Sequence, residues 1–112
     1  MSVEERPWGW FETIEETLTY KLKKIYVNPN QQFSLQYHNN RDEHWVIVEG
    51  SGVITLGDEK SFVKENDSFF IEKGLTHRMS SGNHGILFYE VQMGICDEND
   101  IVRLEDSYGR VD

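Results

Sequence analysis

The stretch that decides the fold of this chain runs from residue 34 to residue 45 and reads Ser34-Leu35-Gln36-Tyr37-His38-Asn39-Asn40-Arg41-Asp42-Glu43-His44-Trp45. Gln36 and His38 are two positions apart, so on an extended strand their side chains leave the same face and converge. Asn39 and Asn40 read as a short turn, after which Glu43 can return on a neighbouring strand. The stretch therefore predicts strands that present an amide, an imidazole and a carboxylate to one point.

A second histidine, His77, follows Gly74 at the end of another expected strand. Two imidazoles, one carboxylate and one amide oxygen make a mixed nitrogen and oxygen site that suits borderline or hard divalent ions, with water completing the coordination. We expect one divalent metal ion, with zinc preferred and manganese, iron, cobalt or nickel left open, on Gln36, His38, Glu43 and His77. The alternative is that the two histidines are unrelated surface or core residues.

The rest of the chain reads almost entirely as strands. Short runs with alternating or β-branched residues predict strands over 20–27, 33–37, 45–48, 53–56, 61–63, 68–71 and 86–93. Turn residues separate them, including a tight turn at 49–52, a hairpin loop at 57–60 and a loop at 81–85. Only 9–19 and 99–105 could carry a helical turn. Short, evenly spaced strands favour a sandwich or barrel over alternating strands and helices.

Composition excludes several classes of function. A length of 112 residues with 38% hydrophobic residues predicts one domain over 1–112 with its own core. The net charge of −9 argues against nucleic acid, whose binding requires clustered lysine and arginine. Every apolar run is far shorter than the roughly 20 residues of a membrane-spanning helix, so no membrane partner is expected. No secretory signal is visible and the single Cys96 is compatible with a reducing compartment, so we expect a cytoplasmic protein.

Two motifs resemble those of the cupin superfamily. The first cupin motif, H-x-H-x(3,4)-E-x(6)-G, is matched by Gln36-x-His38-x(4)-Glu43-x(6)-Gly50, with glutamine in place of the first histidine. The second is matched by Asn66-Asp67, Ile71, Gly74 and His77, whereas Glu72 stands where proline is usual and Ser81 where asparagine is usual. The resemblance implies an all-β fold, the cupin double-stranded β-helix or jelly-roll barrel.

A closer resemblance covers nearly the whole chain. It is similar to the C-terminal isomerase domain of the bifunctional mannose-1-phosphate guanylyltransferase/mannose-6-phosphate isomerase family, through Arg6-Pro7-Trp8-Gly9, Lys23, Ser34-Leu35-Gln36-Tyr37-His38, Arg41, Glu43-His44-Trp45, Glu65-Asn66, His77-Arg78, Glu90-Val91-Gln92, Asp100-Ile101-Val102-Arg103 and Asp106-x-Tyr108-Gly109-Arg110. The resemblance implies a metal-dependent interconversion of mannose 6-phosphate and fructose 6-phosphate. The nucleotide-binding loop of the guanylyltransferase half does not occur in the sequence, so nucleotidyl transfer is not expected.

Three residues are candidates for catalysis. Lys23 shares a strand face with Ile25 and Val27, so its ammonium points inward if those two fill the barrel. A buried lysine can act as an acid or a base, although a structural role is an equal alternative. His44 neighbours Glu43, but strand alternation sends it to the opposite face and makes it a weaker proton shuttle. Arg78 is the third candidate, as a cation that could also hold the substrate.

The substrate phosphate requires cations, and guanidinium groups donate paired hydrogen bonds to its oxygens. We expect Arg103 and Arg110 to bind it, together with Arg41, which could alternatively anchor the turn that carries the metal ligands. Each of these arginines could instead form an ordinary surface salt bridge.

Departures from the family pattern keep other functions open. Asn30 and Glu72 replace the usual glycine and proline, and the 93–98 segment differs from the usual loop. A noncatalytic cupin that binds a sugar or metabolite is the main alternative, and a metal-dependent dioxygenase is a more distant one. The resemblance also implies a homodimer, for which the apolar run 69–71 beside 45–48 offers contact surface.

Overall fold

The computed structural model describes residues 3–110, and every regular element within that range is a strand. The strands are β1 (Val3–Arg6), β2 (Gly9–Glu16), β3 (Tyr20–Val27), β4 (Leu35–Tyr37), β5 (Arg41–Leu56), β6 (Glu59–Lys64), β7 (Ser68–Ile71), β8 (His77–Gly94) and β9 (Val102–Glu105). All pair antiparallel. The strand predictions over 20–27 and 68–71 are confirmed at the same bounds.

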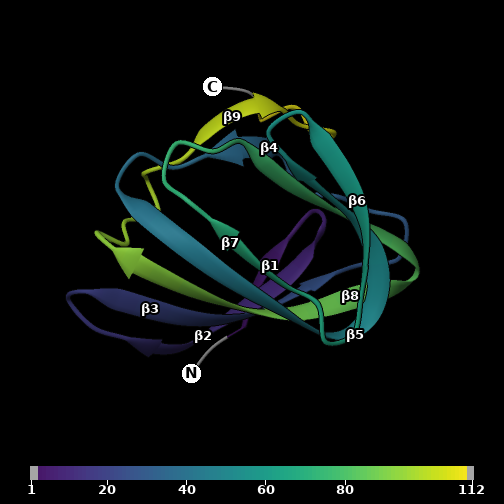
Figure 1. Cartoon of the computed structure of the whole chain (residues 1–112), viewed down its shortest axis with the longest axis horizontal. Coiled ribbons are helices and arrows are strands. Elements are labelled where there is room, and N and C mark those ends of the chain that lie inside the picture. The colour runs from purple at the N-terminus through teal and green to yellow at the C-terminus, as the bar shows by residue number, and fades with distance from the viewer. Residues whose placement is uncertain (1–2, 111–112) are drawn as a thin grey trace.

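The two longest strands, β5 and β8, pair with each other and organise the sheet. On one side of β8 the order continues through β3 and β2 to β1, and its first residues pair with β4, which β9 borders. β6 and β7 pair with the two halves of β5. Figure 1 shows the result, a single curled sheet that wraps around an interior.

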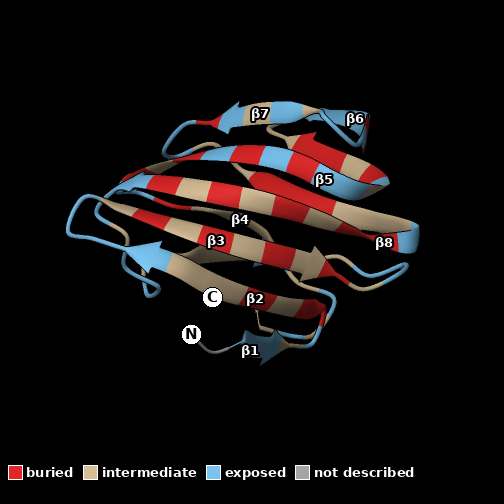
Figure 2. Cartoon of the chain, turned by 90° about the horizontal axis from the view of Figure 1, so that it is seen from below, coloured by how far each residue is buried: buried red, intermediate tan, exposed pale blue. Residues whose placement is uncertain are grey.

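One face of each of the longer strands β2, β3, β5 and β8 fills the interior. Along β3 the residues alternate between half-buried and buried, and the buried positions are Lys21, Lys23, Ile25 and Val27. Figure 2 shows a similar alternation along β8, and an alternation of buried with exposed residues along β5. The largest fully buried apolar side chains are Trp45, Phe88, Ile47, Ile54, Ile71, Met79 and Ile86. This apolar half of the interior supports the polar half, which carries the site.

The two segments that could have carried helical turns are strands instead. Residues 9–16 form β2, which takes backbone hydrogen bonds from β1 and β3 on its two edges. Its Phe11 is buried while the neighbouring Trp10 and Glu12 are half-buried, a period of two rather than 3.6. Residues 102–105 form β9 against β4. The described part of the chain contains no helix of the length and hydropathy that a membrane crossing requires.

The turn predicted at 49–52 and the loop predicted at 81–85 are also wrong, because β5 and β8 continue through them as paired strands. The register shifts between Ile47 and Glu49 and between Gly50 and Gly52. Gly50 has a φ of 85°, and a Cβ there would lie 2.1 Å from the carbonyl oxygen of Gly85. The glycines therefore permit a sharp bend at which the two backbones come into close contact. Pairing between β5 and β8 keeps both strands extended before and after the bend.

Candidate metal centre and its pocket

Three ligand-bearing side chains meet in the interior from three parts of the chain. His38 follows β4, Glu43 lies in β5, and His77 is the first residue of β8. His38 Nε2 is 3.4 Å from Glu43 Oε2, and His77 Nε2 is 3.8 Å from Glu43 Oε1. The potential ligand atoms lie within 4.8 Å of one another, and all three residues are buried. The group could hold a metal ion.

Backbone carbonyls set the tautomers of both imidazoles. His38 Nδ1 lies 2.6 Å from the carbonyl oxygen of Asp100, and His77 Nδ1 lies 3.0 Å from that of Leu75. A carbonyl oxygen only accepts, so each Nδ1 carries the donated hydrogen. Burial, followed by the positive charge of Arg41, lowers the pKa of His38 to about 4, and burial likewise lowers that of His77. Both rings are therefore neutral at pH 7, and each Nε2 offers a lone pair.

The donor set fits a bound cation. Among the described residues, His77 Nε2 is a buried atom without a hydrogen-bond partner. A buried polar atom is costly unless it is paired, and a metal ion would pair it. The carboxylate of Glu43 is oriented by Trp45 Nε1, which donates to Oε1 over 3.0 Å, and by Arg41 Nε, which donates to Oε2 over 2.8 Å.

Gln36, the fourth expected ligand, reaches the same place. Its Nε2 is 3.4 Å from His38 Nε2, while its Oε1 accepts a hydrogen bond from Ser34 Oγ over 2.6 Å. A half-turn of the amide would present the oxygen to the ligand group and give up the bond from Ser34. The expected same-face pairing of Gln36 and His38 thus brings the two side chains together.

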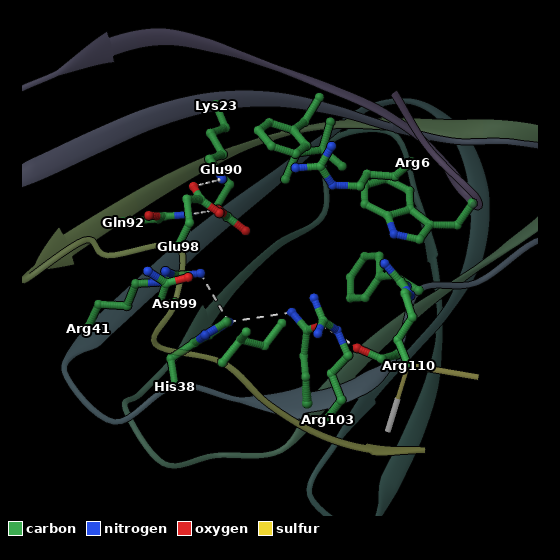
Figure 3. A pocket seen from close by; sticks show the side chains of 17 residues that line it. Arg6, Lys23, His38, Arg41, Glu90, Gln92, Glu98, Asn99, Arg103 and Arg110 are labelled. Carbon is green, nitrogen blue, oxygen red and sulfur yellow. Dashed lines mark hydrogen bonds and ion pairs between the residues drawn. The ribbon is translucent and has the colours of Figure 1, made fainter. Parts of the chain in front are cut away.

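A cavity of about 290 Å³ opens beside this group, and its two ends differ in chemistry. In Figure 3, His38 and Arg41 lie at one end with Lys23, Glu90, Gln92 and Glu98. Three arginines, Arg6, Arg103 and Arg110, lie toward the other end. An acidic protein thus gathers cations in its interior, which suits an anionic ligand.

Two carboxylates beside Lys23 have opposite environments. Glu98 Oε1 accepts from Lys23 Nζ over 2.5 Å and from Lys21 Nζ over 3.1 Å. Partial burial opposes its ionisation, but these lysines outweigh burial and lower the pKa of Glu98 to about 2. Glu90 is buried and accepts from Gln92 Nε2 over 2.5 Å. Burial, then the negative charge of Glu43, raises the pKa of Glu90 to about 7.

The expected site residues divide into two groups by position. Lys23, Arg41, Arg103 and Arg110 line the cavity. His44 does not, because it is exposed on the outer face of β5, where its ring lies 4.8 Å from that of Phe70. Arg78 is also outside the lining, and its guanidinium is engaged by the carbonyl of Phe33 and by Glu105. The structure therefore gives Arg78 a bracing position between β8 and β9 rather than access to a ligand.

Sequence reasoning missed Glu90, Gln92, Glu98 and Arg6 as site residues. Glu90 and Gln92 continue the inward face of β8 that starts with Ile86 and Phe88, so their period of two with buried apolar residues was a usable signal. Glu98 and Arg6 had no such signal, since each reaches the cavity from outside the long central strands.

The comparisons with known proteins agree with this architecture. Residues 2–106 match the family described as Mannose-6-phosphate isomerase C-terminal. The chain belongs to this family. It is 43% identical over 107 residues to the xanthan biosynthesis protein XanB of Xanthomonas campestris, covering 94% of this chain and 23% of that protein. It is 40% identical over 108 residues to the mannose-1-phosphate guanylyltransferase ManC of Salmonella typhimurium, covering 95% and 22% respectively.

This member of the Mannose-6-phosphate isomerase C-terminal family thus spans less than a quarter of the length of these curated relatives. Among solved structures, CapF of Staphylococcus aureus aligns with a TM-score of 0.81 and 21% identity, over 93% of this chain and 34% of CapF. Oxalate decarboxylase of Bacillus subtilis aligns with a TM-score of 0.79 and 21% identity, over 92% and 30%. The predicted all-β cupin fold is confirmed.

Proposed function

We propose that this chain is a metal-dependent sugar-phosphate isomerase that interconverts mannose 6-phosphate and fructose 6-phosphate. The observation that carries the proposal is the buried group of His38, Glu43 and His77, of which His38 lines a cavity that also holds several cations. The match to the Mannose-6-phosphate isomerase C-terminal family supports the same chemistry. Gln36 is proposed as the fourth ligand.

The reaction moves the C2 proton of the open-chain sugar to C1 and the hydroxyl proton of O2 to O1 through an enediol, so the sugar gains and loses no atom overall. Abstraction of the C2 proton leaves negative charge on the carbonyl oxygen. A bound divalent ion supplies positive charge close to that developing oxyanion. The residues of the chain have to bind the sugar phosphate, exclude water and move the proton.

One end of the cavity carries arginines that suit the phosphate of the substrate, and the other carries titratable groups that suit its C1 and C2. Arg103 and Arg110, with Arg6 beside them, offer guanidinium groups for the phosphate. That placement directs C1 and C2 toward the opposite end, where Glu90 and Lys23 stand with His38. Glu90 is our choice for the proton-transferring group, because it is a buried carboxylate in the cavity wall. Lys23 adds positive charge beside it on the neighbouring strand.

The direct test is to reconstitute the protein with zinc, manganese, cobalt, nickel or iron(II) and to measure fructose 6-phosphate formed from mannose 6-phosphate. We expect turnover with at least one ion and none above background for Glu43→Ala. His44→Ala is the matched control, since this neighbouring residue is exposed on the opposite face of the same strand. Absence of turnover with every ion would remove the isomerase proposal.

A noncatalytic sugar-phosphate-binding role is the second candidate. Its support is that Glu98, in the segment where the sequence departs from the family pattern, pairs with Lys23 of the cavity wall and also with Lys21. Calorimetry with mannose 6-phosphate separates the two functions. Saturable binding without turnover favours this role, and turnover excludes it. The dioxygenase alternative has no specific support from the geometry, and oxygen consumption by the iron-loaded protein would test it.

Zinc as the resident ion, a homodimer and a cytoplasmic location are the finer parts of the proposal. The ligand set of two imidazoles and a carboxylate suits zinc. The outer faces of β5 and β7 carry exposed Val46, Val48 and Phe70, which offer apolar surface for a second copy. Light scattering across a range of concentrations tests the dimer, and a monomer at high concentration would contradict it.

A further inference from the structure

The segment between β8 and β9, residues 95–101, forms part of the cavity wall, and we call it the crossing loop. Glu98, Asn99 and Ile101 of this loop line the cavity. Four hydrogen bonds join the loop to residues 38–40, which we call the metal-ligand turn, and Asp100 accepts three of them. The remaining one runs from the amide of Ile95 to the carbonyl of Asn40.

Asp100 contacts the turn through both its side chain and its main chain. Its Oδ1 and Oδ2 accept hydrogen bonds from the backbone amides of Asn39 and Asn40 over 3.0 and 2.9 Å. Its carbonyl oxygen accepts the hydrogen on His38 Nδ1 over 2.6 Å. Asp100 alone thus accepts hydrogen bonds from the two backbone amides that follow His38 and from the His38 imidazole, which it orients.

We propose that Asp100 is a positioning residue for the metal centre, which holds His38 in the tautomer and orientation that offer Nε2 to a metal ion. The inference rests on the metal site of the proposed function and not on isomerase activity. The bonds to the Asn39 and Asn40 amides keep the carbonyl of Asp100 at the distance where it can hold the His38 ring. A partner that orients a metal-bound imidazole in this way raises metal affinity because the ligand is ordered before the ion arrives.

The connection also has a consequence for the cavity. Ile101, which directly follows Asp100, and Arg103, three residues after Asp100, both line the cavity, with Arg103 at the end assigned to the phosphate. The same anchor therefore sets where the chain enters β9. Displacing Asp100 is expected to disturb the metal ligand first and the position of Arg103 second.

The test compares metal binding by Asp100→Ala and Asp100→Asn with the wild-type chain. Asp97→Asn is the matched control, because the Asp97 carboxylate accepts a hydrogen bond from the amide of Asn99 within the same loop. Zinc and cobalt dissociation constants are measured by competition with a chromophoric chelator. We expect Asp100→Ala to weaken both by about 10- to 100-fold, Asp100→Asn by less, and Asp97→Asn by under threefold.

A second measurement guards against a merely structural effect. Nitrogen-15 NMR of the metal-free proteins reports which ring nitrogen of His38 carries the hydrogen. We expect the Nδ1–H form alone in the wild type and a mixture in Asp100→Asn, which removes a charge but little volume and so keeps the fold. Unchanged metal affinity and an unchanged His38 tautomer in Asp100→Asn and Asp100→Ala, whatever their thermal stability, would overturn the inference.

The two proposals fail in different ways. A wild-type chain that binds metal but does not isomerise mannose 6-phosphate loses the proposed function and leaves the role of Asp100 supported by the affinity series. A wild-type chain that binds none of zinc, manganese, cobalt, nickel and iron(II) overturns both.

Discussion

Arg41 donates a hydrogen bond from Nη2 to Nε2 of His38 over 3.1 Å, and this nitrogen is the one that His38 offers to a metal ion. The same guanidinium donates from Nε to Glu43 Oε2 over 2.8 Å. A metal ion and Arg41 therefore compete for the same lone pairs. The buried Arg41 also places a positive charge beside the position that the cation would take.

This competition predicts that Arg41→Met binds metal more tightly than the wild type. Removing a like charge from a buried site favours the ion, and we expect a gain on the order of tenfold in affinity, equivalent to about 1.4 kcal/mol. Chelator competition measures it. Lys60→Met, which removes one exposed positive charge from β6, is the control and should leave the affinity unchanged. Weaker metal binding by Arg41→Met would mean that Arg41 orients Glu43 more than it competes.

Substitution of Glu90 tests the assignment of proton transfer. In Glu90→Gln the cavity keeps its shape but loses the carboxylate, so we expect kcat to fall by about 10²- to 10⁴-fold, the usual contribution of a general base. Exchange of the C2 hydrogen of mannose 6-phosphate with deuterated water should fall in parallel. Glu49→Gln, exposed on β5, is the control. A variant with near-normal exchange would shift the role to Lys23.

The ion pairs of Glu98 predict a stability difference that depends on pH. The folded pKa of Glu98, about 2, lies below the ordinary value of 4.5. A carboxyl with a depressed folded pKa stabilises the fold above its unfolded pKa, and this contribution disappears as the pH falls from about 4.5 toward 2. Glu98→Gln should therefore unfold at a lower temperature than the wild type at pH 7, and the difference should vanish near pH 2.

The difference is expected to be modest because the Glu98 side chain is 51% exposed and solvent screens its charge. Thermal unfolding followed by circular dichroism over pH 2–7 measures it. A wild-type to variant difference that stays constant over this range would show that the Glu98 charge is not what stabilises the crossing loop.

Substituting two glycines that share nearly the same φ distinguishes the cost of backbone strain from the cost of a steric clash. Gly50 and Gly74 have φ values of 85° and 84°, but only the Cβ added at Gly50 meets backbone, at 2.1 Å. Gly74→Ala should cost about 1–2 kcal/mol for the left-handed conformation. Gly50→Ala should cost more, since the bend between β5 and β8 must also open. Urea unfolding gives both values, and equal costs would contradict the close approach.

Much of the fold was predictable because strand alternation is a local property. The prediction over 20–27 is confirmed residue for residue, and the inward placement of Lys23 with Ile25 and Val27 follows from the same alternation. The helical alternative at 9–19 failed because β2 obtains its hydrogen bonds from β1 and β3, and short-range propensity contains no information on those partners. The bends at Gly50 and Gly85 were predicted to end the strands for the same reason.

By itself the sequence determined the family, the alternating strands and the types of ligand that meet: two histidines, a glutamate and a glutamine in cupin spacing. These are properties of neighbouring residues and of motifs. Only the tertiary structure decided which arginines face the cavity, that Arg78 braces β9 instead, and that Asp100, 62 positions from His38, sets its tautomer. The physical reason is that burial and hydrogen-bond partners depend on which strands curl together, and that pairing joins residues far apart in the chain.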